Sequence, residues 1–242
     1  MNAVPDTSAP LSRQVPLLDA ARLERADTQV RDATFRFLVA HEQLPAAAYA
    51  ELERDFPRYA SAGFFPYEAK DCGASVNRLI EELTSPAVAD AIGARLGVPD
   101  LGRLPSLVTL CRFLNKRHGT IHTDSRSKVV TALVYLNASW PHGSEGCLRF
   151  LKRIDDIDDV VVPEIPPLYG TLVAFRRADN SFHGHLPHEG ERRVIQIAWL
   201  TSEQEKLRKT QRGKVSRVLK KLLGALDRRF GARRGRNAAH ED

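Results

Sequence analysis

Hydrophobic positions have the spacing of helices in much of the first hundred residues and form short, strand-like runs after Pro105. In residues 16–60, two helical patterns surround an apolar stretch at Phe35–Val39, and Pro45 predicts the start of the second helix. Over residues 77–97, apolar positions recur every three or four residues, and Pro86 and Gly97 predict a second start and a stop. The N-terminal part is therefore predicted to be helical.

After Pro105 the pattern becomes a series of short runs rich in β-branched and aromatic residues, most of them separated by Pro, Gly, Asn or Asp. The expected strands are residues 107–114, 128–137, 147–151, 160–165, 170–175, 181–185 and 192–200. No helical pattern of 10–15 residues lies between them, which argues against parallel βαβ units. We therefore predict a mainly β fold, an antiparallel sandwich or barrel supported by N-terminal helices.

Composition and charge divide the chain into three parts. Residues 1–14 are rich in Pro, Ser and Ala and are expected to form a flexible arm, residues 15–202 a single domain with its β core at about 105–202, and residues 203–242 a basic helical tail. The tail has 13 basic and 5 acidic residues, whereas the first 202 residues have 23 and 25. The net charge of +6 therefore comes from the tail and does not indicate a body that binds nucleic acid.

Other features of the sequence suggest a cytoplasmic protein. The start of the chain lacks a secretory signal, and the apolar run Val129–Leu136 is far too short to span a membrane. The three cysteines, Cys72, Cys111 and Cys147, are widely spaced and fit neither a disulfide framework nor a zinc site. Cys147 is expected to pack in the core rather than to act as a nucleophile.

The basic tail has two interpretations, which the sequence leaves open. Residues Val215, Val218, Leu219, Leu222, Leu223 and Leu226 form an apolar stripe among lysines and arginines. Such a helix, over residues 206–236, can lie on the anionic inner face of a membrane as a peripheral contact, or it can dock its stripe on the body. Nucleic-acid binding is not expected, because no aromatic stacking platform accompanies the charge.

Candidate chemistry centres on His122 and Asp124, which are two residues apart and so lie on the same side of a strand. His183 follows 59 residues after Asp124, and Arg192 and Arg193 lie nine and ten residues beyond it. Two histidines and one carboxylate form the facial triad of non-haem Fe(II) oxygenases, which leaves open positions on the metal. An arginine on the following strand can bind a carboxylate through two guanidinium nitrogens.

Residues 107–200 resemble the 2-oxoglutarate-dependent Fe(II) dioxygenases, in particular the branch similar to prolyl 4-hydroxylases. The motifs that carry this resemblance are HTD at 122–124, KVVTALVYLN at 128–137, SEGCLRFL at 144–151, GTLVAF at 170–175 and HGHLPHEGERRVIQIAW at 183–199. The resemblance implies a double-stranded β-helix, or jelly roll. It also implies a hydroxylase that uses Fe(II), 2-oxoglutarate and O2, with ascorbate as an optional reductant, and that releases succinate and CO2.

The resemblance also assigns residues. His122, Asp124 and His183 match the metal ligands, Arg193 and Tyr135 match the groups that hold the distal carboxylate of 2-oxoglutarate, and Thr131 and Leu148 would line the same pocket. Strand alternation favours Arg193 over Arg192, because Arg193 shares its side with Ile195, Ile197 and Trp199. That side is the more apolar and is expected to face the barrel interior.

Competing interpretations concern other histidines and other functions. His118 could replace His122 as a ligand, although the family pattern favours His122; His185 and His188 are expected to be polar loop residues, and His142 and His240 exposed ones. Asp155–Asp159 is expected to be a solvated turn rather than a calcium loop. The alternative function is a non-catalytic jelly-roll module that binds a metal or a ligand at a membrane surface. Nucleic-acid demethylation is disfavoured, because the dealkylase branch has arginine where this chain has Glu189. The substrate, whether a small molecule, a peptide or a glycan, is not specified.

Overall fold

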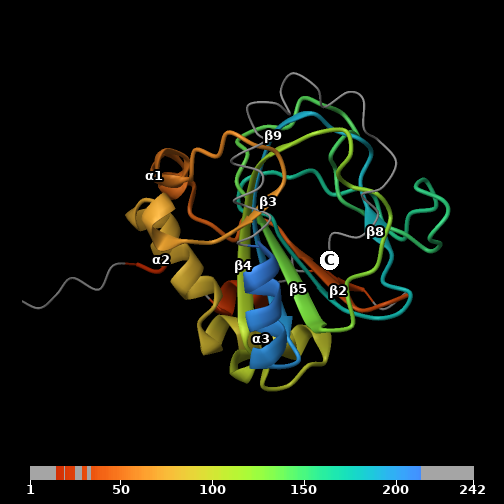
Figure 1. Cartoon of the computed structure of the whole chain (residues 1–242), viewed down its shortest axis with the longest axis horizontal. Helices are drawn as coiled ribbons and strands as arrows, with labels where there is room; N and C mark the ends of the chain where they lie inside the picture. Colours follow the sequence, from red (N-terminus) through yellow and green to blue (C-terminus); the bar gives the residue numbers. More distant parts are fainter. Residues whose placement is uncertain (1–14, 19, 25–28, 32–33, 214–242) are drawn as a thin grey trace, which may run out of the picture.

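The computed structural model describes residues 15–18, 20–24, 29–31 and 34–213, and antiparallel strands dominate it. Seven strands form the major sheet in the order β1-β2-β7-β5-β9-β4-β3 (Figure 1). The strands of this sheet are β1 (Gln29–Arg31), β2 (Phe37–Ala40), β3 (Phe64–Pro66), β4 (Ser106–Leu114), β5 (Lys128–Tyr135), β7 (Leu172–Arg176) and β9 (Gly190–Leu200). The expectation of a mainly β, antiparallel fold is confirmed.

A second, smaller layer faces the major sheet. It contains β6 (Arg149–Phe150) and β8 (His183–Gly184), which pair antiparallel with each other. Isolated bridges, Leu148 with Ile165 and Leu151 with Val160, extend this layer. The expected strand at residues 160–165 is therefore wrong, since only its two ends form bridges and the chain bends between them at residues 161–163.

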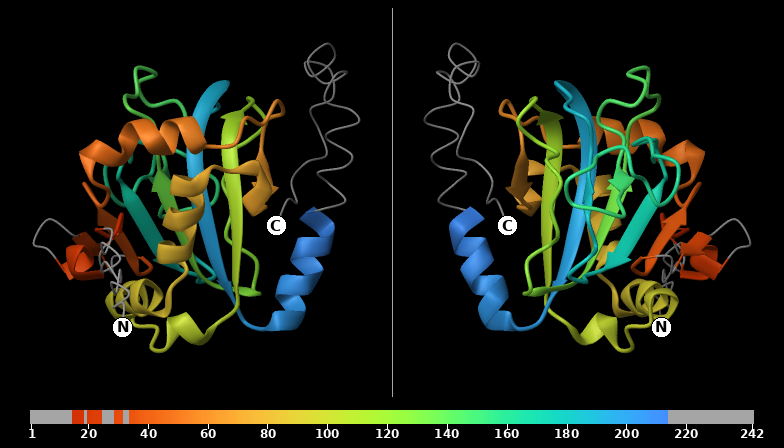
Figure 2. Two further views of the ribbon diagram at one scale, coloured as in Figure 1. Left: turned by 90° about the vertical axis from the view of Figure 1, so that its left-hand side faces the viewer. Right: turned by 90° about the vertical axis from the view of Figure 1, so that its right-hand side faces the viewer.

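Helices cover the other face of the major sheet, as the positions of α1, α2 and β8 in Figure 1 and the side views in Figure 2 show. The α-helices are α1 (Tyr49–Asp55), α2 (Ala74–Leu83) and α3 (Pro86–Leu96), and the 3-10 helices are η1 (Ala20–Glu24), η2 (Ala46–Ala48), η3 (Ala69–Asp71) and η4 (Leu101–Arg103). Pro86 begins α3 and Gly97 ends it with a left-handed φ of 68°, as the sequence predicts.

Both faces of the major sheet are buried, each in its own apolar cluster. The helix-side cluster joins α2 and α3 to one face of β4, β5 and β9 and includes Leu79, Leu83, Ile92, Leu110, Val134, Ile195, Ile197 and Trp199. The interior cluster fills the space between the two sheets and includes Phe37, Cys111, Tyr135, Leu148, Phe150, Phe175 and Val194. The apolar residues of β9 therefore divide between two cores.

A further helix, residues 203–213, packs beside the β core. The Nζ of Lys209, which is buried, donates a hydrogen bond of 2.9 Å to the Oγ of Ser125. Among the described residues, none of the helices has the length and apolar character needed to cross a membrane. The arm at 1–14, the apolar stripe from Val215 to Leu226 and His240 lie outside the described residues.

Candidate active site

His122 and His183 are brought together by an isolated antiparallel bridge. The backbone N–H of each residue donates to the carbonyl oxygen of the other at 3.0 Å. Residues paired in this way have side chains on the same side of the ladder, and their ring centroids lie 4.4 Å apart. A segment following β4 and the short strand β8 thus supply two imidazoles to one point.

The orientation of each imidazole is fixed by its own backbone. Nδ1 of His122 lies 2.8 Å from the carbonyl oxygen of Thr120, and Nδ1 of His183 lies 2.9 Å from that of Ser181. A carbonyl oxygen can only accept, so Nδ1 carries the proton in both rings and Nε2 retains its lone pair. Burial, reinforced by the neighbouring His122, lowers the pKa of His183 to about 4, which keeps this ring neutral at pH 7. Both rings therefore present a metal-binding nitrogen.

Asp124 is buried and both of its carboxylate oxygens have partners. Oδ1 accepts from the Nζ of Lys128 at 2.5 Å, and Oδ2 accepts from the Oγ1 of Thr131 at 2.5 Å. Burial acts to raise the pKa of this carboxyl, but the Lys128 ammonium, together with His183 and the hydrogen bond from Thr131, holds the pKa well below its usual range. The carboxylate is therefore ionised at neutral pH and held in one orientation by two groups on β5.

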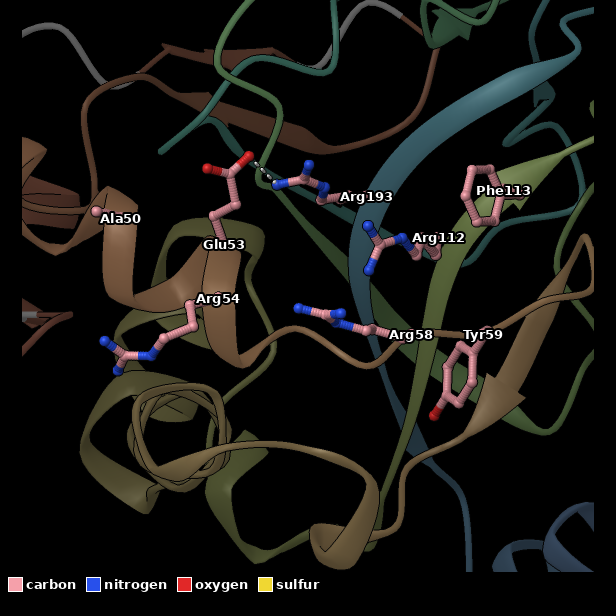
Figure 3. Close-up of a pocket in the computed structure, with 8 residues that line it drawn as sticks. All are labelled: Ala50, Glu53, Arg54, Arg58, Tyr59, Arg112, Phe113 and Arg193. Carbon is pink, nitrogen blue, oxygen red and sulfur yellow. Dashed lines mark hydrogen bonds and ion pairs between the residues drawn. The ribbon is translucent and has the colours of Figure 1, made fainter.

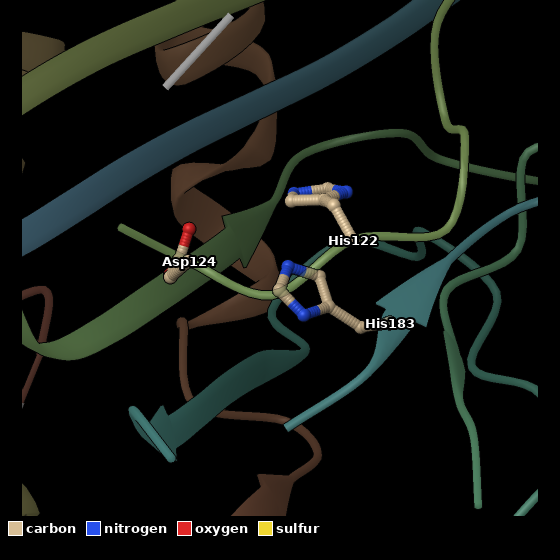
Figure 4. A group of neighbouring side chains, drawn as sticks. All are labelled: His122, Asp124 and His183. Carbon is tan, nitrogen blue, oxygen red and sulfur yellow. The ribbon is translucent and has the colours of Figure 1, made fainter. Parts of the chain in front are cut away.

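The three side chains form a group that fits Fe(II) (Figure 4). One ligand atom from each of His122, Asp124 and His183 lies within 4.8 Å of the other two, and no other such group of three or more occurs in the described part of the chain. Two neutral imidazoles and a carboxylate are the donor set of the non-haem Fe(II) facial triad. The hydrogen bonds from Nδ1 to backbone carbonyls are the contacts that usually orient metal-binding histidines.

Arg192, not Arg193, faces the interior between the two sheets. Its side chain is buried, its Nε donates to the carbonyl oxygen of Gly146 at 2.8 Å, and its Nη2 donates to the hydroxyl of Tyr135 at 3.3 Å. The guanidinium also lies over the Tyr135 ring, 5.1 Å from its centroid. One arginine and one tyrosine thus converge in an apolar surrounding that can receive a carboxylate.

Arg193 points to the opposite side of β9, and its expected place in the interior is wrong. It forms ion pairs of 2.8 Å with Glu191 and with Glu53 of α1. The strand alternation itself is correct: Arg193 does share a side with Ile195, Ile197 and Trp199, but that side meets the helices. The more apolar face of a sheet with two buried faces need not be the one that faces the site.

Two further residues assigned to the pocket lie near the expected positions. Leu148 is buried in the interior cluster with Tyr135. Thr131 is also buried, and it hydrogen-bonds the metal-side carboxylate of Asp124. Lys128 is a functional residue that the sequence did not indicate, because its contact with Asp124 is made only by the turn that leads into β5.

Competing histidines are accounted for by other contacts. Nδ1 of His118 lies within hydrogen-bonding distance of the backbone of Asn115, in its own turn, and His118 is not part of the metal group. His185 is half-buried, and burial, together with the nearby Arg192, lowers its pKa to about 3. His188 lies in a loop, as expected, but it is buried there against Trp140 and His142.

Comparison with known proteins bears on the family and the fold. Residues 108–201 match the model of the 2OG-Fe(II) oxygenase superfamily. A prolyl-4-hydroxylase from Pseudomonas putida is 20% identical with a TM-score of 0.50, over 75% of this chain and 97% of that one. The 2OG complex of a viral collagen prolyl hydroxylase from Paramecium Bursaria Chlorella virus-1 is 14% identical with a TM-score of 0.46, over 71% and 97%. No curated protein matches the chain. The Pseudomonas structure confirms the expected jelly-roll fold.

Proposed function

We propose that the chain is a 2-oxoglutarate-dependent dioxygenase of the 2OG-Fe(II) oxygenase superfamily, whose model matches residues 108–201, and that it hydroxylates a C–H bond of its substrate with release of succinate and CO2. The observation that carries the proposal is a shared interior. The ring of His183 lies 4.6 Å from that of Phe175, and Phe175 and Tyr135 belong to the same buried cluster. The histidine–aspartate group and the Arg192–Tyr135 pair therefore border one apolar space.

Each residue of this interior has a distinct role in the proposal. His122, Asp124 and His183 would hold Fe(II), which when bound supplies the activation of O2 and the oxidation of 2-oxoglutarate. Arg192 would bind the distal carboxylate of 2-oxoglutarate through its guanidinium, and the Tyr135 hydroxyl would donate to the same carboxylate. The apolar side chains around them exclude water and strengthen these charge interactions.

Lys128 and Thr131 act through Asp124. Their two hydrogen bonds fix the carboxylate plane, and the positively charged Lys128 ammonium competes with a metal ion for Oδ1. Lys128 is the partner with the longer, more mobile side chain, and it can move its ammonium group aside while Thr131 continues to orient the other oxygen. We therefore expect Thr131 to be the residue that positions Asp124 in the loaded enzyme.

The test is the visible charge-transfer band that forms when 2-oxoglutarate chelates Fe(II) without oxygen. We expect the band in the wild-type protein and a weaker affinity for 2-oxoglutarate in Arg192→Ala, by roughly tenfold to a hundredfold, since hydrogen bonds to a charged group contribute about 1.5–3 kcal/mol. Arg193→Ala is the matched control on the other side of β9 and should change the affinity little.

Two results would contradict the proposal. A folded, iron-loaded protein that shows no band would mean that the site serves another metal or has no turnover, in favour of the binding module. A loss of affinity in Arg193→Ala rather than Arg192→Ala would place the carboxylate on the helix side. The family match favours the oxygenase over the binding module.

A further inference from the structure

A cavity of about 590 Å³ lies on the helix side of the major sheet, away from the interior that holds the metal group. It is open to solvent and is bordered by the end of α1 and the segment that follows it, together with one end of β4 and β9 (Figure 3). Its lining residues are Ala50, Glu53, Arg54, Arg58, Tyr59, Arg112, Phe113 and Arg193. Four of these eight carry a guanidinium group.

Three of the guanidinium groups approach the same space. Figure 3 shows Arg58, Arg112 and Arg193 extending from three different segments toward the middle of the cavity, while Arg54 points away. Arg54 pairs with Asp55 and is 66% exposed, so it belongs to the rim. Arg112 and Arg193 are only 20% and 11% exposed, so their positive charge is held close to the cavity wall.

Carboxylates inside the wall balance only part of this charge. Oε1 of Glu191 accepts from the Nε of Arg112 at 3.0 Å and from the Nε of Arg193 at 2.8 Å, and Glu53 pairs with Arg193 at 2.8 Å. Two carboxylates thus pair with two of the three arginines. In the part of the chain that the structure describes, Arg58 has no ion-pair partner, and it is exposed. The group that would complete the balance is an anion from solution.

The backbone of β4 is adapted to this cavity. The register of β4 against β9 shifts between Cys111 and Phe113, as at a β-bulge, and consecutive side chains Arg112 and Phe113 both line the cavity. In a regular strand, consecutive side chains would point to opposite faces. Bulges commonly re-aim side chains in this way next to binding sites. The irregularity therefore adds an aromatic wall beside the arginines.

We propose that this cavity, which we call the arginine pocket, binds a small organic anion whose phosphate or carboxylate group contacts Arg58, Arg112 and Arg193. Its volume is in the range of small-molecule sites, and the rings of Phe113 and Tyr59 provide an apolar wall for the body of the ligand. Guanidinium groups bind either oxyanion through paired N–H donors. Because Arg192 lies on the other side of β9, the arginine pocket is distinct from the proposed 2-oxoglutarate site.

The test is isothermal titration calorimetry of the iron-loaded protein with saturating 2-oxoglutarate, without oxygen and at constant ionic strength. Three probes separate the sources of the anion: inorganic phosphate, phenyl phosphate and benzoate. We expect saturable binding of phenyl phosphate, of benzoate, or of both, tighter than that of inorganic phosphate. Arg58→Gln should weaken it at least tenfold, whereas Arg103→Gln, with the same change of charge at a side chain that is 83% exposed, should not.

Each outcome of these titrations either supports or contradicts anion binding in the arginine pocket. Binding of phenyl phosphate alone identifies a phosphate ester as the ligand class, and binding of benzoate alone identifies a carboxylate. No saturable binding at millimolar concentrations, or equal binding by Arg58→Gln and wild type, overturns the proposal. Arg192→Ala separates the two sites: probe binding lost in this variant but kept in Arg58→Gln would mean that the anion occupies the interior. Probe binding that survives Arg192→Ala supports the arginine pocket even if 2-oxoglutarate does not bind.

Discussion

Asp124 carries a carboxylate that is only 3% exposed and is still ionised. Removing a carboxylate from water carries a cost that only close partners offset. The Lys128 ammonium is the single charged partner within hydrogen-bonding distance in the described part of the chain. The stability of the metal-free protein should therefore depend on this lysine.

Lys128→Met should lower the free energy of unfolding of the metal-free protein by about 3 kcal/mol at pH 7. In the wild type, the lowered pKa of Asp124 means that its stabilisation is present above the unfolded pKa and is lost as pH falls through the folded value. In the variant, burial without an ammonium raises the pKa of Asp124. Lowering the pH then protonates this carboxyl and reduces the variant's loss of stability. The difference between the two proteins should therefore be smaller at pH 4 than at pH 7.

Urea unfolding in the presence of a chelator, at pH 7 and pH 4, measures both values. Lys152→Met is the matched control, because Lys152 pairs with Asp159 at 3.0 Å but is 54% exposed. Its loss should cost less than about 1 kcal/mol at either pH. Equal losses for the two variants at pH 7 would show that the Lys128 contact adds nothing beyond a surface pair.

The three cysteines should react at different rates, according to how deeply each is buried. Cys147 is buried, and this desolvation, with Glu164 nearby, raises the pKa of its thiol to about 11. At pH 8 only about one Cys147 thiol in a thousand is then ionised, and the thiolate is the form that reacts. Cys72 is half-buried, whereas Cys111 is buried. We expect iodoacetamide to modify Cys72 first.

Peptide mass spectrometry over time measures the three rates. The urea-unfolded protein is the control, in which all three thiols should react at similar rates. Native Cys147 that reacts as fast as Cys72 would indicate an activated nucleophile and would reopen the role that the sequence argues against.

At the scale of elements, long strands and capped helices are readable from the sequence, but short pairings are not. Residues 107–114 and 192–200 coincide with β4 and β9 to within a residue or two, because their length and β-branched content outweigh local alternatives. The strand β3 was not anticipated, since its pairing with β4 comes from tertiary contact rather than from a pattern of its own. The same limit explains Arg192, because no pattern within one strand tells which of two buried faces meets the second sheet.

The metal group was easier to predict than the arginine for a physical reason. His122 and Asp124 are neighbours along the chain, so their spacing already restricts where both can point. Their meeting with His183 requires a bridge between distant segments; the donor set of the facial triad and the family resemblance suggested it, but no spacing along the chain predicts it. Lys128 is part of neither pattern, because its contact with Asp124 depends on how the chain turns into β5.

Helix α3 offers a prediction at the same scale. The Oγ of Ser85 accepts from the backbone N–H of Val88 at 3.4 Å, so Ser85 caps the helix that Pro86 begins. Ser85→Ala should lower the free energy of unfolding by about 1 kcal/mol, because a backbone donor loses its partner. Affinity for 2-oxoglutarate should stay unchanged. Thermal or urea unfolding measures the first value, and Ser139→Ala, in an exposed loop, is the control expected to show no loss.

The whole molecule is electrically asymmetric, with its excess positive charge at one end of the chain. Residues 214–242 contain 9 basic and 3 acidic side chains. A chain that ends at Gly213 keeps the Lys209–Ser125 contact and loses this charge. We expect the full chain to sediment with anionic vesicles and the shortened chain to stay in solution, since each basic residue near an anionic surface contributes about 1 kcal/mol.

Neutral vesicles and high salt are the controls, because both remove the electrostatic attraction. Equal sedimentation of the two chains on anionic vesicles would favour the other interpretation, a tail that docks on the body.

The placement of Arg192 and Arg193 is more sensitive to insertions and deletions in β9 than to substitutions of its residues. Arg192 and Arg193 lie on opposite sides of the same wall, each with its own carboxylate, tyrosine or carbonyl partners. Many substitutions near them preserve that division, but an insertion or deletion of one residue just before them would exchange the two sides. β9 is hydrogen-bonded on both edges, to β4 and to β5, so it cannot slide to correct such an error. We therefore expect related chains to differ in this strand by substitutions far more often than by insertions or deletions.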